Sequence, residues 1–182
     1  MNFTNELDID DNNYYDVLFE TVLAPEGDCF NISAVLRMHN IEDDEEKILG
    51  YASIYLFNEF MLDTWDNLLD ISDSISGDVL EVMYVLEKAK ENENIFGLIT
   101  VIDHIEIYNE YRNKGYSSIL INKIIEYFNY INVNYVGLIP ARIYSDRVVQ
   151  NEDKAIQYYI NKGFKPLSRH LDGDLVMGKS LI

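Results

Sequence analysis

Alternation between strand and helix in the second half of the chain is the feature that most constrains its fold. Short apolar runs predict strands, and apolar residues at helical spacing predict helices. The predicted order is strand, helix, strand, helix and hairpin, over residues 102–108, 118–128, 135–139, 151–164 and 167–181. Pro140 stops the second strand, and Asp172-Gly173 is a strong turn signal within the hairpin.

The first half of the chain predicts a different arrangement. Residues 14–23, 30–39 and 47–57 read as three strands, and an acidic turn separates the last two, so we expect an antiparallel meander. Residues 60–92 switch to helical spacing with a break at 72–77, which predicts two helices. With 182 residues, of which 48% are hydrophobic, the chain is long enough for one domain with a substantial core. We therefore expect a single α+β domain, residues 1–182.

Arg112–Ser117 is the best candidate for an anion-binding turn, because it follows a predicted strand and leads directly into a helix. The start of a helix presents unpaired backbone N–H groups and the positive end of the helix dipole. A pyrophosphate can therefore bind there without dedicated side chains. Gly115 lets the backbone come close to such a group, and Arg112 and Lys114 add positive charge.

The predicted helix within residues 151–164 carries its own start and stop signals. Asn151 can cap the helix, and Glu152 and Asp153 suit its first turn. Gly163 supplies the left-handed conformation that ends a helix, and Phe164 follows it. The helix is therefore well defined by local signals alone.

Together, these two segments resemble motifs A and B of the GNAT superfamily of N-acetyltransferases. Motif A is Arg or Gln, two residues, Gly, any residue, then Gly or Ala; here Ser117 holds the last position, which departs from the pattern. Motif B matches in its inward-facing Ala155, in Tyr159 four residues before Gly163, and in the Gly-Phe exit. The resemblance covers residues 95–182 well and residues 14–57 by element order only. It implies a mostly antiparallel mixed sheet of six or seven strands, flanked by helices, with a splayed parallel pair.

The resemblance also implies acetyl-CoA as the cosubstrate, held in the wedge between the strands that end near Tyr108 and Ile139. The pantetheine arm would pair with strand backbone there, as an added strand does. The implied cofactor-binding residues come from the fourth strand, the turn, the following helix start and the motif B helix. They are Ile105, Glu106, Ile107, Arg112, Asn113, Lys114, Gly115, Tyr116, Ser117, Ser118, Asn151 and Tyr159.

In family members, a neutral amine attacks the thioester directly, and a tyrosine protonates the departing thiolate. Tyr159 has the family spacing and is the expected general acid, with neighbouring Tyr158 as the second choice. A backbone N–H of Glu106 or Ile107 would steady the oxyanion. Asn151 is either a cofactor contact or a plain helix cap.

The general base is left open by the residues themselves. Strict strand alternation would place Asp103 and Glu106 on opposite faces, so only one of them can meet an amine. Glu106 is our preferred catalytic base; a polar residue on a partly exposed strand, or a water chain acting as the base, is the alternative.

Charge is distributed unevenly along the chain. Residues 1–94 hold 23 acidic and 4 basic residues, whereas residues 95–182 hold 9 and 10. An anionic cofactor would be accepted by the second segment, and the first would lie on the acceptor side. The net charge of −18 argues against nucleic acid as a partner. The acidity suits either a solvated surface or a mouth that selects a cationic small-molecule or peptide amine. The competing class is a non-catalytic acidic interaction protein that keeps the fold.

Several other features carry no site in our interpretation. Gly173–Ser180 matches the P-loop pattern, but its middle belongs to a predicted strand and only two residues follow, so we reject a nucleotide loop. The three histidines lack metal-ligand spacing, and no metal is expected.

The lone cysteine, Cys29, suits a buried position and a reducing compartment. Without a signal-peptide pattern or a spanning apolar run, we expect a cytoplasmic protein; the oligomeric state stays open, a dimer included.

Overall fold

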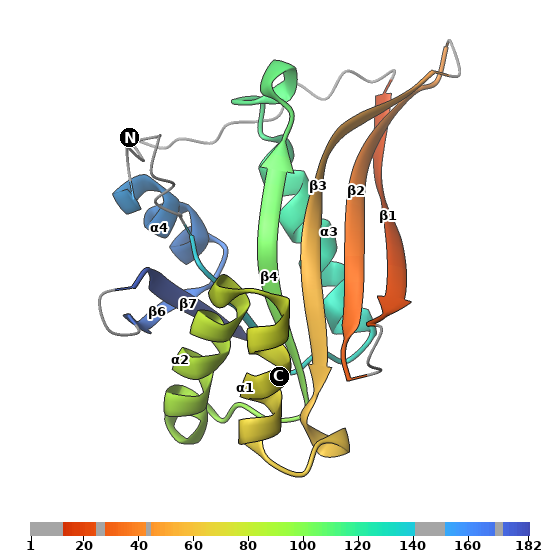
Figure 1. The fold of residues 1–182 in the computed structure, drawn as a ribbon. Coiled ribbons are helices and arrows are strands. Elements are labelled where there is room, and N and C mark those ends of the chain that lie inside the picture. The colour runs from red at the N-terminus through yellow and green to blue at the C-terminus, as the bar shows by residue number, and fades with distance from the viewer. Residues whose placement is uncertain (1–12, 25–27, 43–44, 141–151, 170–172) are drawn as a thin grey trace.

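The computed structural model describes residues 13–24, 28–42, 45–140, 152–169 and 173–182. One seven-stranded sheet runs through it, in the order β1-β2-β3-β4-β5-β7-β6 (Figure 1). The strands are β1 Asn13–Leu23, β2 Phe30–Asn40, β3 Glu46–Asn58, β4 Leu98–Ile107, β5 Tyr135–Leu138, β6 Lys165–Arg169 and β7 Leu175–Ser180. This confirms the predicted α+β class and the strand number.

The sheet is antiparallel except at one place. Strands β1 to β4 form the predicted meander, each pairing with the next in the chain. β4 and β5 are the parallel pair, in register from Ile99 opposite Tyr135 to Ile102 opposite Leu138. β5 then pairs antiparallel with β7, and β7 with β6. The mixed sheet with a single parallel pair is therefore the arrangement that the motif resemblance implied.

Helices cover both faces of the sheet and divide the core in two. α1 Trp65–Ile75 and α2 Gly77–Glu93 lie on the face toward the viewer in Figure 1, and α3 Tyr116–Tyr130 lies behind the sheet. α4 Glu152–Asn161 shares its apolar cluster with α3. Two short 3₁₀ turns, η1 Glu59–Met61 and η2 Asn109–Tyr111, follow β3 and β4. Among the described residues, no helix is both long and apolar enough to cross a bilayer.

The break between the first two helices is shorter than predicted. We expected it at residues 72–77, but α1 continues to Ile75, and Ser72 lies buried inside it. Its hydroxyl donates to the carbonyl of Leu68 at 2.6 Å, which satisfies the polar group within the helix. Ser76 alone forms the break, because it ends α1 and its side chain caps α2 through the N–H of Val79.

The hairpin at the end of the chain decides the P-loop question. Leu175–Ser180 is β7, an inner strand of the sheet, so the pattern at 173–180 has no helix to present N–H groups to a phosphate. The rejection of a nucleotide loop is confirmed. Cys29 is buried as predicted, with 3% of its surface exposed.

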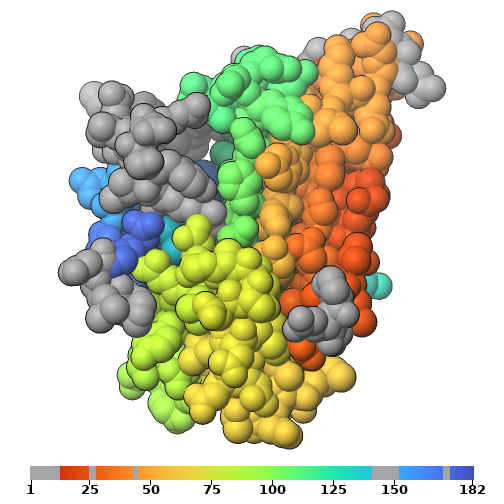
Figure 2. All heavy atoms as spheres, viewed as in Figure 1, coloured from red at the N-terminus to blue at the C-terminus, as the bar shows by residue number. Residues whose placement is uncertain are grey.

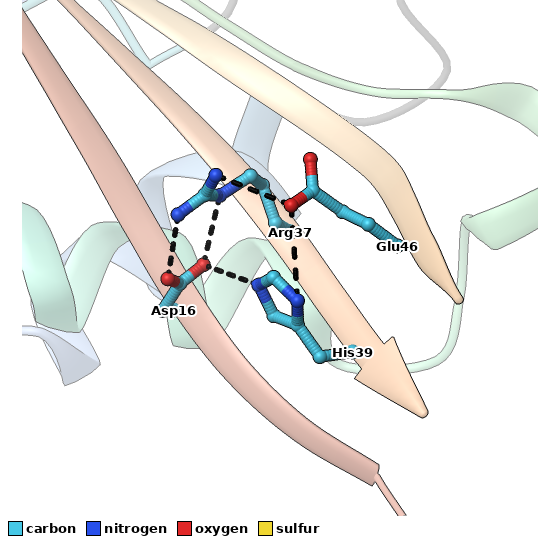
Figure 3. Close-up of polar contacts among 4 residues, drawn as sticks. All are labelled: Asp16, Arg37, His39 and Glu46. Carbon is cyan, nitrogen blue, oxygen red and sulfur yellow. Dashed lines mark hydrogen bonds and ion pairs between the residues drawn. The ribbon is translucent and has the colours of Figure 1, made fainter. Parts of the chain in front are cut away.

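The upper ends of β1, β2 and β3 are joined by an ionic network on the face of the sheet toward the viewer, above the part that α1 and α2 cover (Figure 1 and Figure 3). Arg37 binds the Asp16 carboxylate with two hydrogen bonds, at 2.7 and 3.0 Å, and reaches Glu46 at 3.2 Å. His39 Nε2 lies 3.2 Å from Asp16, and its ring stacks on Tyr14 at 4.5 Å. The network holds together three strands that are covered by α3 on the other face but by no described helix on this one.

Candidate anion-binding turn and acetyl-transfer site

The turn between β4 and α3 has the backbone shape that an anion-binding turn needs. β4 ends at Ile107, η2 follows, and the chain then reverses into α3. Asn113 and Gly115 both have positive φ, of 62° and 84°. Gly115 is the residue before the helix and makes no side-chain cap, so the first N–H groups of α3 are not closed off. Glycine suits this left-handed position because it has no Cβ to clash.

Five consecutive amides at this turn are available to a ligand. Within the part of the chain that the structure describes, the N–H groups of residues 113–117 donate to no protein acceptor. Residues Arg112–Gly115 are exposed, and Tyr116 and Ser117 are half-buried. Ser118, the last residue of the predicted set, differs, because its amide already donates to the Gly115 carbonyl at 2.9 Å. The free amides are therefore those of Asn113–Ser117.

The two basic side chains of the turn behave differently. Arg112 Nε donates to the Ile107 carbonyl at 2.8 Å, and its Nη2 lies 3.4 Å from Glu106 Oε1. This side chain ties the turn to the end of β4. Lys114 is exposed, and its ammonium lies 5.9 Å from the centre of the Tyr111 ring. Lys114 is thus the mobile charge of the turn, and Arg112 fixes its geometry.

β4 presents backbone groups on an open edge just before the turn. Its parallel pairing with β5 stops at Ile102. The N–H of Tyr108 donates to the Leu49 carbonyl of β3 at 2.9 Å. Because successive backbone groups of a strand point to opposite edges, those of Ile105 and Ile107 face away from β3, where no described strand pairs with them. The Glu106 amide points toward β3, so Ile107 is the better placed of the two predicted oxyanion donors.

Strict alternation does not hold along β4, contrary to the argument used for the base. Ser53 of β3 lies opposite His104, and the next residue, Ile54, lies opposite Ile102, so Asp103 is an extra residue in a β-bulge. Sequence spacing alone therefore cannot assign Asp103 and Glu106 to opposite faces. A single inserted residue leaves no periodic signal, which is why the sequence did not show it.

A polar cluster surrounds Glu106, the predicted general base, on the face of the sheet that carries the ionic network. Glu106 lies opposite Tyr51 of β3, and its side chain is 36% exposed. His104 Nε2 is 3.6 Å from Glu106 Oε2. Burial, and then the charge and hydrogen bond of Glu106, raise the pKa of Tyr51 above its ordinary value of 10.0. The sequence did not predict that Tyr51 and His104 lie beside Glu106, since only the register of β3 and β4 brings them there.

The predicted general acid lies on α4, against the cluster shared with α3. The Tyr159 ring packs on Phe164 at 5.5 Å and on Tyr158 at 5.1 Å, and Tyr159 is half-buried. The Ser118 hydroxyl lies 3.4 Å from that of Tyr158, so Tyr158 is already engaged with the start of α3. Gly163 has φ of 84°, which confirms the predicted helix end. Asn151 lies outside the described residues.

No protein-family model matches the chain, and no curated protein matches its sequence. Several solved structures have a similar fold, and three of them illustrate the likeness. They are the PaiA enzyme of Thermoplasma acidophilum, solved with coenzyme A (11% identity, 85% of this chain, TM-score 0.42), nourseothricin acetyltransferase (14%, 94%, 0.41), and NAA60 of Arabidopsis thaliana, solved with acetyl-CoA (16%, 81%, 0.46). The matches span 62%, 88% and 76% of those chains, so less than two thirds of PaiA is covered. At these identities, a functional assignment rests on the chain's own residues.

Proposed function

We propose that the chain is an acetyl-CoA-dependent N-acetyltransferase that transfers the acetyl group directly to a primary amine. The observation that carries this proposal is the run of five amides, Asn113–Ser117, that donate to no acceptor among the described residues and lie at a helix start beside the open edge of β4. Backbone donors in this arrangement bind a diphosphate, and an open strand edge pairs with an extended amide chain. Coenzyme A carries both groups.

The residues present fit this cosubstrate along one continuous path. The diphosphate would lie on the amides of residues 113–117, with the Lys114 ammonium beside it. The pantetheine amides would pair with the outward backbone groups of Ile105, since the Ile107 carbonyl already accepts from Arg112 and the Ile107 amide is kept for the thioester oxygen. Acetyl-CoA supplies an activated acyl group as its thioester. The path leads from the turn toward the polar cluster around Glu106.

The chemistry needs a donor for the thioester oxygen, an acid and a base. The Ile107 amide is the proposed donor to the oxygen as negative charge develops on it. The amine nitrogen bonds to the acyl carbon while the carbon–sulfur bond breaks, and Tyr159 supplies the proton that the leaving sulfur takes. Glu106, with His104 beside it, is the proposed acceptor of the proton that the amine loses. A cationic amine is the acceptor that suits the acidic first half of the chain.

Two measurements on the intact chain and one pair of variants test this function. Saturating acetyl-CoA should raise the melting temperature by roughly 5 to 10 °C, and a panel of amines should release free thiol from acetyl-CoA. The Tyr159→Phe variant should lose about 100-fold in kcat with little change in cosubstrate affinity, whereas Tyr158→Phe, its matched control, should stay within a factor of about three. Equal turnover of the two variants would contradict the assignment of the acid.

A non-catalytic acidic protein that keeps this fold is the second candidate. One observation favours it: Glu106 Oε1 lies 3.4 Å from Arg112 Nη2 and Glu106 Oε2 lies 3.6 Å from His104 Nε2, so both carboxylate oxygens already have protein partners. Such a protein would capture a basic partner in a salt-sensitive manner and release no thiol. Thiol release that depends on an added amine would exclude it.

A further inference from the structure

A second cavity lies away from the turn, where the lower ends of β1, β2 and β3 meet α1. Its floor is one row of the sheet, in which Val22 lies opposite Asn31 and Asn31 opposite Tyr55. Ile71 and Ile75 of α1 form a wall. The described part has a volume of about 580 Å³, which is within the range of small-molecule sites. Figure 1 shows α1 beside this end of the sheet.

The lining of this cavity is mostly apolar. Side chains from the sheet, from the β1–β2 connection and from α1 contribute Val22, Leu23, Cys29, Tyr55, Ile71 and Ile75. Val22 and Leu23 are 65% and 51% exposed, so these apolar surfaces are not covered by other described parts of the chain. Figure 2 shows the atoms of β1–β3 beside those of α1. An organic group that fills the cavity would remove this apolar surface from water.

The mouth of the cavity is acidic. An adjoining hollow of about 320 Å³ shares Asp28, Ile71 and Ser74 with it, and adds Asn67 and Asp70. Asp28 and Asp70 are exposed, and no lysine or arginine occurs among the described residues that line either hollow. A cation at the mouth would therefore meet two carboxylates without a competing positive side chain.

We propose that this cavity binds an amphipathic organic cation, whose apolar body fills the chamber and whose charged nitrogen lies between Asp28 and Asp70. The apolar chamber selects for an apolar body, and the acidic mouth selects for a positive charge. A purely polar cation gains nothing from the chamber, and an apolar anion is repelled at the mouth. The proposal does not depend on acetyl transfer, because it concerns residues that are far in the sheet register from Glu106: Tyr55 lies opposite Val101, whereas Tyr51 lies opposite Glu106.

The n-octylammonium ion is the test ligand, and n-octanoate is its matched control with the same chain and the opposite charge. In an NMR titration of the intact chain, octylammonium should shift the amides of residues 22–24, 28–31 and 71–75 saturably. It should bind at least about 10-fold more tightly than octanoate. Shifts that do not saturate, that map to other residues, or that are equal for the two ions would overturn the proposal.

Variants locate the two halves of the site. The double change Asp28→Asn and Asp70→Asn should reduce the preference for octylammonium to about twofold, because both carboxylates are lost. Asp66→Asn with Asp73→Asn removes the same charge without touching the lining, and should keep the preference. Ser74→Phe should block the chamber and abolish binding. All variants should keep the wild-type melting temperature within a few degrees; a folded Ser74→Phe protein that binds octylammonium normally would contradict the proposal.

Discussion

The ionic network on β1–β3 and the turn before α3 use polar groups in opposite ways. In the network, Arg37 engages both Asp16 and Glu46, and His39 contacts the same two carboxylates. In the turn, five successive backbone donors have no described protein acceptor. Groups that are satisfied internally stabilise the fold, whereas groups left unsatisfied at an exposed position gain most from a ligand. Changes in the network should therefore alter stability, and changes in the turn should alter ligand affinity.

Among changes in these two regions, the largest expected effect is on stability, from Arg37→Met. Removing the guanidinium leaves the carboxylates of Asp16 and Glu46 facing each other without their shared cation, so the free energy of unfolding should fall by about 2 kcal/mol. Urea denaturation measures this change in the free energy of unfolding. Lys47→Met is the control, because Lys47 makes one exposed ion pair with Glu45 and should change stability by less than about 0.5 kcal/mol. Equal losses would mean that the network is no stronger than a surface pair.

The next effect is on affinity, from Gly115→Ala. A Cβ at a φ of 84° strains the turn, which should weaken acetyl-CoA binding about tenfold as measured by titration calorimetry. Gly77→Ala is the control, since Gly77 begins α2 and an added Cβ there meets nothing within 4 Å. That change should leave affinity unaltered and slightly raise stability. Unchanged affinity of Gly115→Ala would remove the turn from the binding site.

A smaller effect is the pH dependence of stability that Asp16 contributes. Burial acts to raise the pKa of Asp16, but hydrogen bonds and charge from Arg37 and His39 outweigh it, so the pKa falls below its ordinary value of 3.8. The ionised carboxylate therefore stabilises the fold above pH 3.8, and this contribution is lost as the pH falls through the lower, folded-state pKa.

Comparison of wild type with Asp16→Asn isolates that contribution. At pH 6 the variant should be less stable by about 0.5 to 1 kcal/mol, a modest figure because Asp16 is 39% exposed. Below pH 3.8 the difference should shrink toward zero. A difference that stays constant from pH 6 to pH 3 would show that the Asp16 charge is not what the network uses.

The smallest effect tests the one mobile charge of the turn. Lys114→Gln should weaken acetyl-CoA binding about two- to threefold at low salt, and less at high salt, because the ammonium is exposed and screened. Lys123→Gln changes an exposed lysine farther along α3, which pairs with Glu126, and should have no effect. If both variants bind alike at low salt, the backbone amides account for the affinity without Lys114.

Much of the fold followed from local signals in the sequence. The strands of the meander, the start of α3 and the helix end at Gly163 were predicted within a few residues, because alternation, turn signals and a left-handed glycine act over short spans. The helix break at 72–77 was placed too early, since a serine inside a helix can satisfy its hydroxyl on the preceding turn, as Ser72 does. In the sequence, Ser72 gives the same helix-break signal as Ser76, which does end the helix.

For the candidate site too, the sequence predicted the local features and not those that depend on strand pairing. Residues 113–117 were recognisable because a turn and a helix start are contiguous in sequence. The cluster of Tyr51 and His104 around Glu106 was not, since it depends on which residues of β3 and β4 lie opposite each other. The bulge at Asp103 and the cavity between α1 and the sheet are also products of pairing and packing.

The sequence by itself determined the elements, the exposed turn with its glycine, and the unequal charge of the two halves, because each is written in neighbouring residues. Only the tertiary structure decided that β4 and β5 are parallel and separate after Ile102, that Ile107 rather than Glu106 turns its amide to the open edge, and that an apolar chamber has an acidic mouth. The physical reason is that register, strand direction and cavities arise from contacts between residues distant in the chain, which no local pattern encodes.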